Sequence, residues 1–271
     1  MNRIDSTFED LRERNETAFI PFVTAGDPDL DTTRRVILAA EEVGATLIEL
    51  GFPFSDPVAD GPTIQASYSR VLEREQTTED VFELVEAVRE ESEIPIVAMI
   101  SYSLVYRMGF DRFLDRACRA GLDGATIPDL PVEEMRGLVE KARERDFHLV
   151  CFVTPATTRE RRSMVVSLAG GFIYYIAVRG ITGERQALPE DLSENLRELK
   201  RQTDVPVAVG FGISAPEHAK TVAREADGVI VGSAIVRRIR KAELDGGDPV
   251  VAAGEFIGQM VRATRDAEPS R

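Results

Sequence analysis

The stretch that decides the fold is LIELGFPFSDPVADGPTIQ, residues 47–65. A short apolar segment carries the carboxylate of Glu49 and opens into a loop with three prolines and two further acids, Asp56 and Asp60. The stretch contains no Lys or Arg. In parallel αβ barrels, functional groups stand at the ends of strands and on the loops that follow them. The stretch therefore predicts a barrel strand that presents acid–base groups from a stiff acidic loop.

Alternation predicts the direction in which Glu49 points. Side chains of a strand alternate between its two faces, so Ile48 and Leu50 share one face and Glu49 lies on the other. The outer face of a barrel strand packs on helices and takes large apolar residues, which places Glu49 inside. Burial of a carboxylate without a partner raises its pKa. A structural Glu that caps a loop or pairs with a buried Arg remains the alternative.

Apolar strand patterns alternate with amphipathic helix patterns along the whole chain. The strand candidates are residues 19–24, 46–50, 96–100, 124–127, 149–153, 172–177, 207–210 and 228–231. Apolar residues recur at helical spacing over 32–43, 78–91, 110–120, 133–145, 159–168, 192–200, 216–224 and 233–241. Eight such units favour a closed (βα)8 TIM barrel over an open doubly wound sheet. No GxGxxG motif opens the first helix, which also disfavours a dinucleotide fold.

The two ends of the chain add helices to this pattern. Residues 6–14 predict an extra N-terminal helix that could cover the barrel floor, and residues 250–265 predict a closing C-terminal helix. A length of 271 residues suits one barrel, so we expect a single domain over 1–271, with 266–271 as a frayed tail.

Composition limits the classes of partner. A formal net charge of −14 disfavours binding to nucleic acid or to an anionic membrane. Cys118 and Cys151 lie in apolar segments without metal-ligand spacing, and His148 and His218 are isolated, so we expect reduced core thiols and no metal site. We see neither a leader nor an apolar run long enough to span a bilayer, which predicts a cytoplasmic protein.

Glycines in three loops predict a phosphate site. Gly183 follows the sixth strand, Gly212 the seventh, and Gly232 with Ser233 the eighth. Glycines let backbone N–H groups approach an anion, and Ser233 could cap the eighth helix, whose positive end would then face the phosphate. Loops after strands seven and eight are the usual phosphate site of such barrels. The alternative is that the glycines only make tight turns and Ser233 is an ordinary N-cap.

Four segments resemble the tryptophan synthase α subunit family. The longest is residues 49–65, and the others are residues 21–28, 210–214 and 232–236, in the order expected of the family. Two departures lie on the side that would face a partner. Residues 101–105 lack the usual Asn and look one residue shorter, and Pro128 stands where many members have Ala. The segment 177–179 is also a less usual variant.

The resemblance implies the retro-aldol cleavage of indole-3-glycerol phosphate to indole and glyceraldehyde 3-phosphate, a lyase reaction of tryptophan biosynthesis. It implies that Glu49 transfers protons at the ring carbon and the side-chain hydroxyl, and that Asp60 holds the ring nitrogen. It also implies an apolar indole slot, for which ordinary core packing is the competing interpretation. The slot residues would be Phe22, Ile100, Tyr174 and Phe211.

The polar segment 180–188 predicts a lid, and in the family the threonine matching Thr182 contacts the catalytic aspartate. A passive surface loop is the alternative. The resemblance further implies no cofactor in this chain, and pyridoxal phosphate in a partner β subunit of an α2β2 heterotetramer. Phe54 and Asp56, on the rim loop, are the residues expected to face that partner.

Three other functions stay open from the sequence. The chain could be a stand-alone indole-releasing lyase, another phosphate-binding barrel such as a sugar-phosphate isomerase, or a non-catalytic regulatory subunit. Both Glu49 and Asp60 are present, which disfavours the regulatory subunit.

Overall fold

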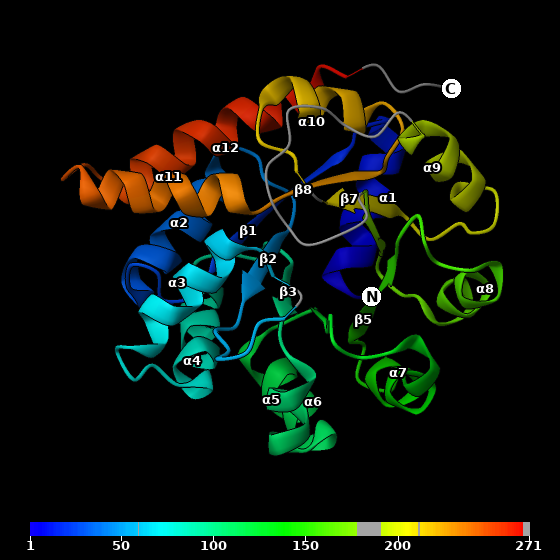
Figure 1. Cartoon of the computed structure of the whole chain (residues 1–271), viewed down its shortest axis with the longest axis horizontal. Coiled ribbons are helices and arrows are strands. Elements are labelled where there is room, and N and C mark those ends of the chain that lie inside the picture. Colours follow the sequence, from blue (N-terminus) through cyan, green and yellow to red (C-terminus); the bar gives the residue numbers. More distant parts are fainter. Residues whose placement is uncertain (59, 178–190, 211, 268–271) are drawn as a thin grey trace.

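Eight parallel strands close into a barrel in sequential order, as predicted (Figure 1). The computed structural model describes residues 1–58, 60–177, 191–210 and 212–267. Ala18 of the first strand pairs with Gly228 of the eighth, so each strand has two neighbours. The strands are β1 (Ala18–Thr24), β2 (Ile48–Gly51), β3 (Ile96–Met99), β4 (Gly124–Thr126), β5 (His148–Val153), β6 (Ile173–Ile176), β7 (Val207–Gly210) and β8 (Gly228–Val231).

Helices surround the barrel and cover the outer face of its strands (Figure 1). Those that match predicted helices are α2 (Leu30–Glu42), α4 (Thr78–Arg89), α6 (Phe110–Ala120), α7 (Arg136–Arg143), α8 (Arg159–Leu168), α9 (Leu192–Lys200), α10 (Pro216–Ala223) and α11 (Ser233–Leu244). The helix predicted over 133–145 is shorter than expected, because a separate 3₁₀ turn, Val132–Glu134, follows Pro131. The closing helix is α12 (Pro249–Arg265); Asp266 caps it and Ala267 is buried.

Two helices in the described ranges were not predicted. The first is α3 (Pro62–Leu72), which follows the acidic loop, and the second is α5 (Tyr102–Met108), which follows β3. The third strand is predicted over residues 96–100, but β3 ends at Met99. Ser101 caps α5 by accepting the N–H of Ser103, which turns the chain from strand to helix at once.

Alternation divides the apolar residues between two sides of the barrel wall. Ile48 and Leu50 belong to the large cluster between the strands and the outer helices. Leu47, on the other side of β2, packs inside the barrel with Ile20 and Val97. Burial of an Ile or Leu side chain contributes roughly 1.5–3 kcal/mol, so this alternation fixes the register of β2 strongly. The inward direction predicted for Glu49 follows from that register.

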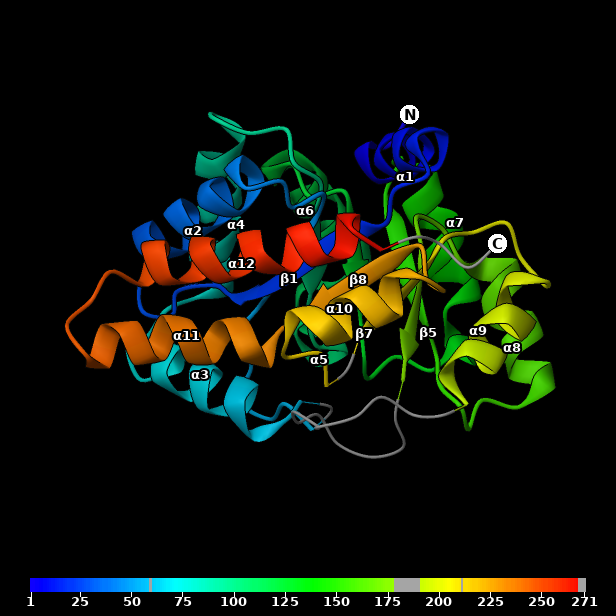
Figure 2. The ribbon, with the colours of Figure 1, turned by 90° about the horizontal axis from the view of Figure 1, so that it is seen from above.

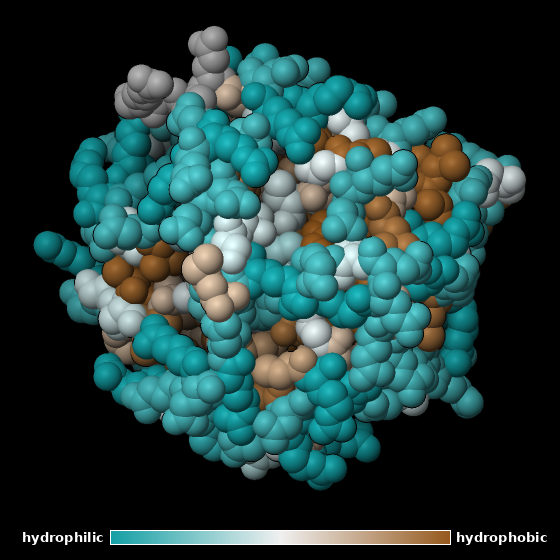
Figure 3. All heavy atoms as spheres, turned by 180° about the vertical axis from the view of Figure 1, so that it is seen from behind, coloured by the Kyte–Doolittle hydropathy of each residue, from teal (hydrophilic) through white to brown (hydrophobic). Residues whose placement is uncertain are grey.

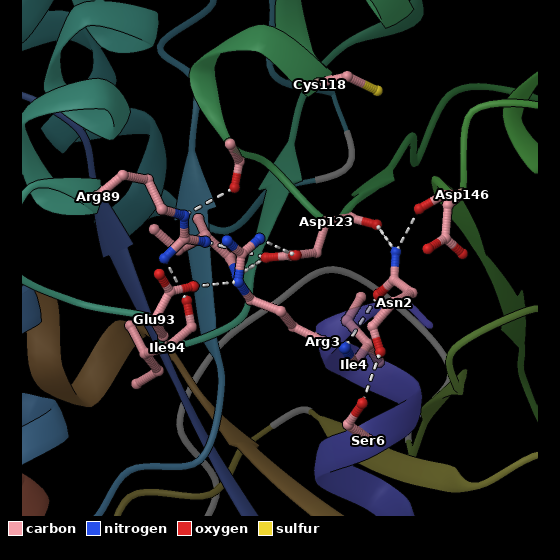
Figure 4. A network of polar contacts seen from close by, with 12 residues as sticks. Asn2, Arg3, Ile4, Ser6, Arg89, Glu93, Ile94, Cys118, Asp123 and Asp146 are labelled. Atoms are coloured by element: carbon pink, nitrogen blue, oxygen red, sulfur yellow. Dashed lines mark hydrogen bonds and ion pairs between the residues drawn. The ribbon is translucent and has the colours of Figure 1, made fainter.

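The N-terminal helix α1 (Arg3–Arg14) closes one end of the barrel (Figure 2). Arg3 and Arg89 each donate at 3.0 Å to the carboxylate of Asp123, which is 4% exposed and also accepts the backbone N–H of Ile96 at 2.8 Å (Figure 4). Asn2 adds a bond of 2.9 Å to the Asp123 carbonyl. Burial raises the pKa of Asp123, and the two arginines oppose that rise. These contacts fasten α1 to the end of the barrel away from α3 (Figure 2).

The surface is largely polar on one face of the molecule. The face seen in Figure 3 is mostly hydrophilic, with hydrophobic residues in separate patches. Within the described ranges, no helix combines the length and apolar character needed to cross a membrane. Cys151 is a buried free thiol, as expected, whereas Cys118 is only half-buried. His148 begins β5 and His218 lies on α10.

Candidate active site

Two carboxyl groups lie buried at the end of the barrel where the strands finish. Glu49 is 2% exposed, stands inside β2, and lies in register with Phe22 of β1 and Val97 of β3. Asp60 is 7% exposed and lies on the loop between β2 and α3. The structure thus brings the two predicted acids together from a strand and from the loop that follows it.

The environment of Glu49 favours its neutral form. Burial, and secondly the charge of Asp60, raises the pKa of Glu49 to about 8, while the neighbouring Thr126 hydroxyl acts in the opposite direction. Oε1 of Glu49 and Oγ1 of Thr126 are both buried, and neither has a hydrogen-bond partner in the described part of the chain. No buried Arg pairs with Glu49 among those residues, so the structural-Glu alternative loses its main support. A carboxylic acid that stays protonated near neutral pH can donate a proton to a substrate.

Asp60 has a different environment on an anchored loop. Its backbone N–H bonds to the Pro57 carbonyl at 3.0 Å, and the Gln65 amide of α3 donates to the Asp60 carbonyl at 2.8 Å. Burial, and secondly the charge of Asp129, raises the pKa of Asp60 to about 6. Asp60 is therefore mostly ionised at neutral pH while Glu49 is mostly protonated. The pair can supply one acid and one anion to the same ligand.

Asp129 connects the loops around Asp60. Its carboxylate accepts the Ser101 hydroxyl and the Tyr102 N–H, both at 2.7 Å. Local sequence pattern does not predict the effect of Asp129 on Asp60, because the two residues lie on different loops. Pro128 and Asp129 line a cavity with Asp60, Ile100 and Met99.

The predicted indole residues occupy two sides of the site. Phe22 is buried in a small cluster that the sequence analysis missed, and Tyr174 packs on Phe152 with ring centroids 5.1 Å apart. Ile100 packs outside the barrel wall but also lines the cavity beside Asp60. Phe211 lies outside the described residues. The cluster around Phe22 contains Ile64, Tyr68 and Val236, with Met99 packed against it.

Three of the four predicted phosphate residues, Gly212, Gly232 and Ser233, lie within the described ranges. Gly212 has φ of +76°, a left-handed conformation that favours glycine. Gly232 is the N-cap of α11 and lies beside Phe22, since an added β-carbon there would be 3.4 Å from the Phe22 Cβ. The prediction that Ser233 caps this helix is wrong, because Ser233 is the first residue of the helix. The N-cap is Gly232, whose dihedral angles (φ −115°, ψ −83°) turn the chain into the helix. Thr182 and Gly183 lie outside the described residues, as does the predicted lid, 180–188.

The rim loop leaves part of its surface open. Asp56 is exposed, Phe54 is half-buried, and both line the cavity beside Asp60. Val58 is 68% exposed on the same loop, and Tyr106 of α5 is 75% exposed. Among the residues described, no group of three or more His, Cys, Asp or Glu side chains could hold a metal ion.

The fold is a TIM barrel, and two buried carboxyl groups with unequal pKa values lie at the ends of its strands. This arrangement is typical of an enzyme that uses general acid–base chemistry.

Comparison with known proteins defines the family. A family model described as tryptophan synthase alpha chain matches residues 8–265. The tryptophan synthase alpha chain of Rhodopirellula baltica is 47% identical and is aligned over 98% of this chain and 99% of its own length. The tryptophan synthase alpha chain of Geobacter sp. is 43% identical and is aligned over 96% of this chain and 97% of its own length.

Solved structures agree with this assignment. Tryptophan synthase subunit alpha from Legionella pneumophila superposes with a TM-score of 0.90 at 35% identity, covering 97% of this chain and 98% of that one. A chain of the tryptophan synthase α2β2 complex from Pyrococcus furiosus gives a TM-score of 0.84 at 38% identity. The match covers 91% of this chain and 98% of that one. The chain belongs to the tryptophan synthase alpha chain family. It is a carbon–carbon lyase of tryptophan biosynthesis, whose reaction is the cleavage of indole-3-glycerol phosphate.

Proposed function

We propose that Glu49 and Asp60 divide the work of cleaving indole-3-glycerol phosphate to indole and glyceraldehyde 3-phosphate. The observation that carries this proposal is their unequal environment, with pKa values of about 8 and about 6 in one buried site. The protonated carboxyl of Glu49 gives its proton to C3 of the indole ring. The carboxylate of Asp60 accepts the ring N–H and stabilises the positive charge that develops on the nitrogen.

Bond cleavage then returns the proton to Glu49. As the bond between C3 and the side chain breaks, its electron pair restores the aromatic ring. The adjacent hydroxyl loses its proton to the Glu49 carboxylate and becomes the aldehyde oxygen. Glu49 is thus the donor in one step and the acceptor in the next, and it ends protonated. A pKa slightly above neutral suits a group that must do both.

The remaining site residues bind the two ends of the substrate. Phe22, Ile100 and Tyr174 contact the indole ring, together with Phe211. The N–H groups near Gly212, Gly232 and Ser233 bind the phosphate with Gly183, and Thr182 acts as part of a lid. Phe22 supports this arrangement, since it stands beside Glu49 in the sheet and beside Gly232 at the start of α11. The lyase reaction needs no cofactor in this chain.

We further propose that the chain works in the cytoplasm with a pyridoxal-phosphate β subunit in an α2β2 complex. Phe54 and Asp56 of the rim loop face this partner, and the exposed side chains of Val58 and Tyr106 support an interface there. Asp60 lies on the same loop, so binding of the partner can alter the site.

The test is indole release from indole-3-glycerol phosphate by the purified chain, with and without a β subunit. Wild type should release indole slowly alone and faster with the partner, whereas Glu49→Gln and Asp60→Asn should lose most activity in both assays. Glu140→Gln, an exposed position on α7, is the matched control and should behave as wild type. An inactive wild type would point to the isomerase or regulatory alternative, and an active Glu49→Gln would remove Glu49 from the mechanism.

A further inference from the structure

Tyr68 lies in the middle of α3, at the edge of the active site. Its side chain is 3% exposed and packs with Phe22, Ile64 and Val236. A hydrogen bond of 2.7 Å between Thr24 of β1 and Ser67 holds this part of α3 against the barrel. Packing of this kind would be satisfied by a phenylalanine, so the hydroxyl needs a separate explanation.

The hydroxyl of Tyr68 lies over the end of β2, next to the catalytic pair. A β-carbon added to Gly51 would be 2.8 Å from the Tyr68 oxygen and 2.5 Å from Cζ of Phe22. Gly51 is two residues after Glu49 and therefore faces the same side of the strand. The missing side chain at Gly51 is what lets the hydroxyl reach the barrel mouth. Tyr68 also lines the cavity that contains Asp60.

The surrounding charges keep this hydroxyl protonated. Burial, then the charge of Asp60, then that of Glu49, raises the pKa of Tyr68 well above its usual range. The hydroxyl of Tyr174 lies over Gly210 in a similar way, 2.4 Å from the position of a β-carbon added there. The pKa of Tyr174 is also raised, but the charge of Glu49 contributes more to that rise than the charge of Asp60. Of these two tyrosines, Tyr68 is the one on which the charge of Asp60 acts more strongly than that of Glu49. A neutral phenol is a hydrogen-bond donor at every pH at which the enzyme works.

We propose that Tyr68 is a positioning residue for the lyase reaction, whose hydroxyl donates a hydrogen bond to the carboxylate of Asp60 when substrate is bound. The inference rests on the proposed role of Asp60. Within the described residues this hydroxyl makes no hydrogen bond, to Asp60 or to any other group, but Tyr68 and Asp60 line the same cavity. A tyrosine that is only 3% exposed normally finds a partner for its hydroxyl. Bonds of this kind tighten when substrate fills the site.

The hydrogen bond would orient the carboxylate of Asp60 and would favour its ionised form. One carboxylate oxygen accepts from Tyr68, which leaves the other free to accept the ring N–H of the substrate. A hydrogen bond to the ionised form lowers the pKa of Asp60, against the effects of burial and of Asp129. The carboxylate is then present when positive charge develops on the ring nitrogen.

The test is Tyr68→Phe, which keeps the ring and removes only the hydroxyl. We expect kcat for indole release to fall roughly ten- to hundredfold, the range of a hydrogen bond to a charged group, with KM changed less than about threefold. The acid limb of the kcat pH profile should move up by roughly one pH unit, because Asp60 loses a donor to its ionised form. The melting temperature should stay close to that of wild type.

Tyr175→Phe is the matched control. Tyr175 lies on the outer side of β6, and its buried hydroxyl has no hydrogen-bond partner in the described ranges. Its removal should change neither kcat nor the pH profile. Tyr68→Phe with the same kcat and the same acid limb as this control would overturn the proposal.

A double-mutant cycle separates this proposal from the role of Asp60 itself. If Tyr68 acts through Asp60, Tyr68→Phe should have almost no further effect in an Asp60→Asn background. The full loss in both backgrounds would refute the hydrogen bond while leaving the role of Asp60 intact. Asp60→Asn with wild-type turnover would instead refute the role of Asp60 on which the proposal rests.

Discussion

Replacing Glu49 with glutamine should stabilise the fold while it removes the activity. The folded state holds the pKa of Glu49 at about 8, against an ordinary value of 4.5, mainly because the carboxyl is buried. A raised pKa means that this group's contribution to stability is full below pH 4.5 and is lost as the pH rises through 8. Glutamine has almost the same shape and never ionises.

The pKa shift gives the size and the pH dependence of the effect. At pH 7 the unfolded chain gains about 3 kcal/mol from ionising Glu49, because about 2.5 pH units at about 1.4 kcal/mol each separate pH 7 from the ordinary pKa. The net effect on stability is below about 1 kcal/mol at pH 5 and about 4 kcal/mol at pH 8, where the folded protein also ionises in part. Glu49→Gln should therefore melt roughly 5–10 °C above wild type at pH 7.

Thermal unfolding of both proteins from pH 5 to pH 8, followed by circular dichroism, measures this difference. Indole release by the variant should fall roughly 10²–10⁴-fold in parallel, the usual loss of a general acid–base group. Glu140→Gln, on the exposed face of α7, should show no pH-dependent gain. A stability difference that does not grow with pH would refute the argument that Glu49 is buried in its neutral form.

Three further outcomes test other parts of the site. Asp60→Asn should lower kcat by roughly 10²-fold or more, because an amide cannot offset charge on the ring nitrogen; steady-state assays would contradict this if the variant kept wild-type turnover. Gly212→Val should raise KM, and it should reduce the free energy of unfolding by about 1–2 kcal/mol, because φ at Gly212 is +76°. KM is measured by substrate titration and stability by urea unfolding. A loss of stability without a change in KM would contradict a phosphate site at Gly212. Asp56→Ala should reduce activation by a β subunit and spare the slow activity of the isolated chain, as its side chain is exposed on the rim; an equal loss of both rates would assign Asp56 to the catalytic machinery.

Local pattern was enough to predict the barrel and the direction of Glu49. Alternation of Ile48, Glu49 and Leu50 depends only on neighbours in sequence, and the structure confirms the faces that it predicts. The apolar runs of the eight strands are similarly local. β7 and β8 have the predicted bounds, and the ends of the other six strands differ by one or two residues, because hydrogen bonds to neighbouring strands decide where a strand begins and ends.

Features that depend on distant contacts or on backbone angles were missed. Ile64, Tyr68 and Val71 have helical spacing, which could have revealed α3, but the proline-rich loop before them suggested irregular structure. The effect of Asp129 on Asp60 joins two loops far apart in sequence. The cap of α11 depends on the dihedral angles of Gly232, which the amino-acid types do not specify.

Closure of the barrel has a consequence for how the protein is made. β1 pairs with β8, and Ala18 and Gly228, which face each other, are 228 − 18 = 210 residues apart. A ribosome must therefore release nearly the whole chain before the first strand finds its second neighbour. Until then both outer strands of the growing sheet have unpaired backbone groups, which can join strands of other chains. Only the last βα unit removes both open edges at once, so the growing chain is most exposed to strand pairing with other chains just before synthesis ends.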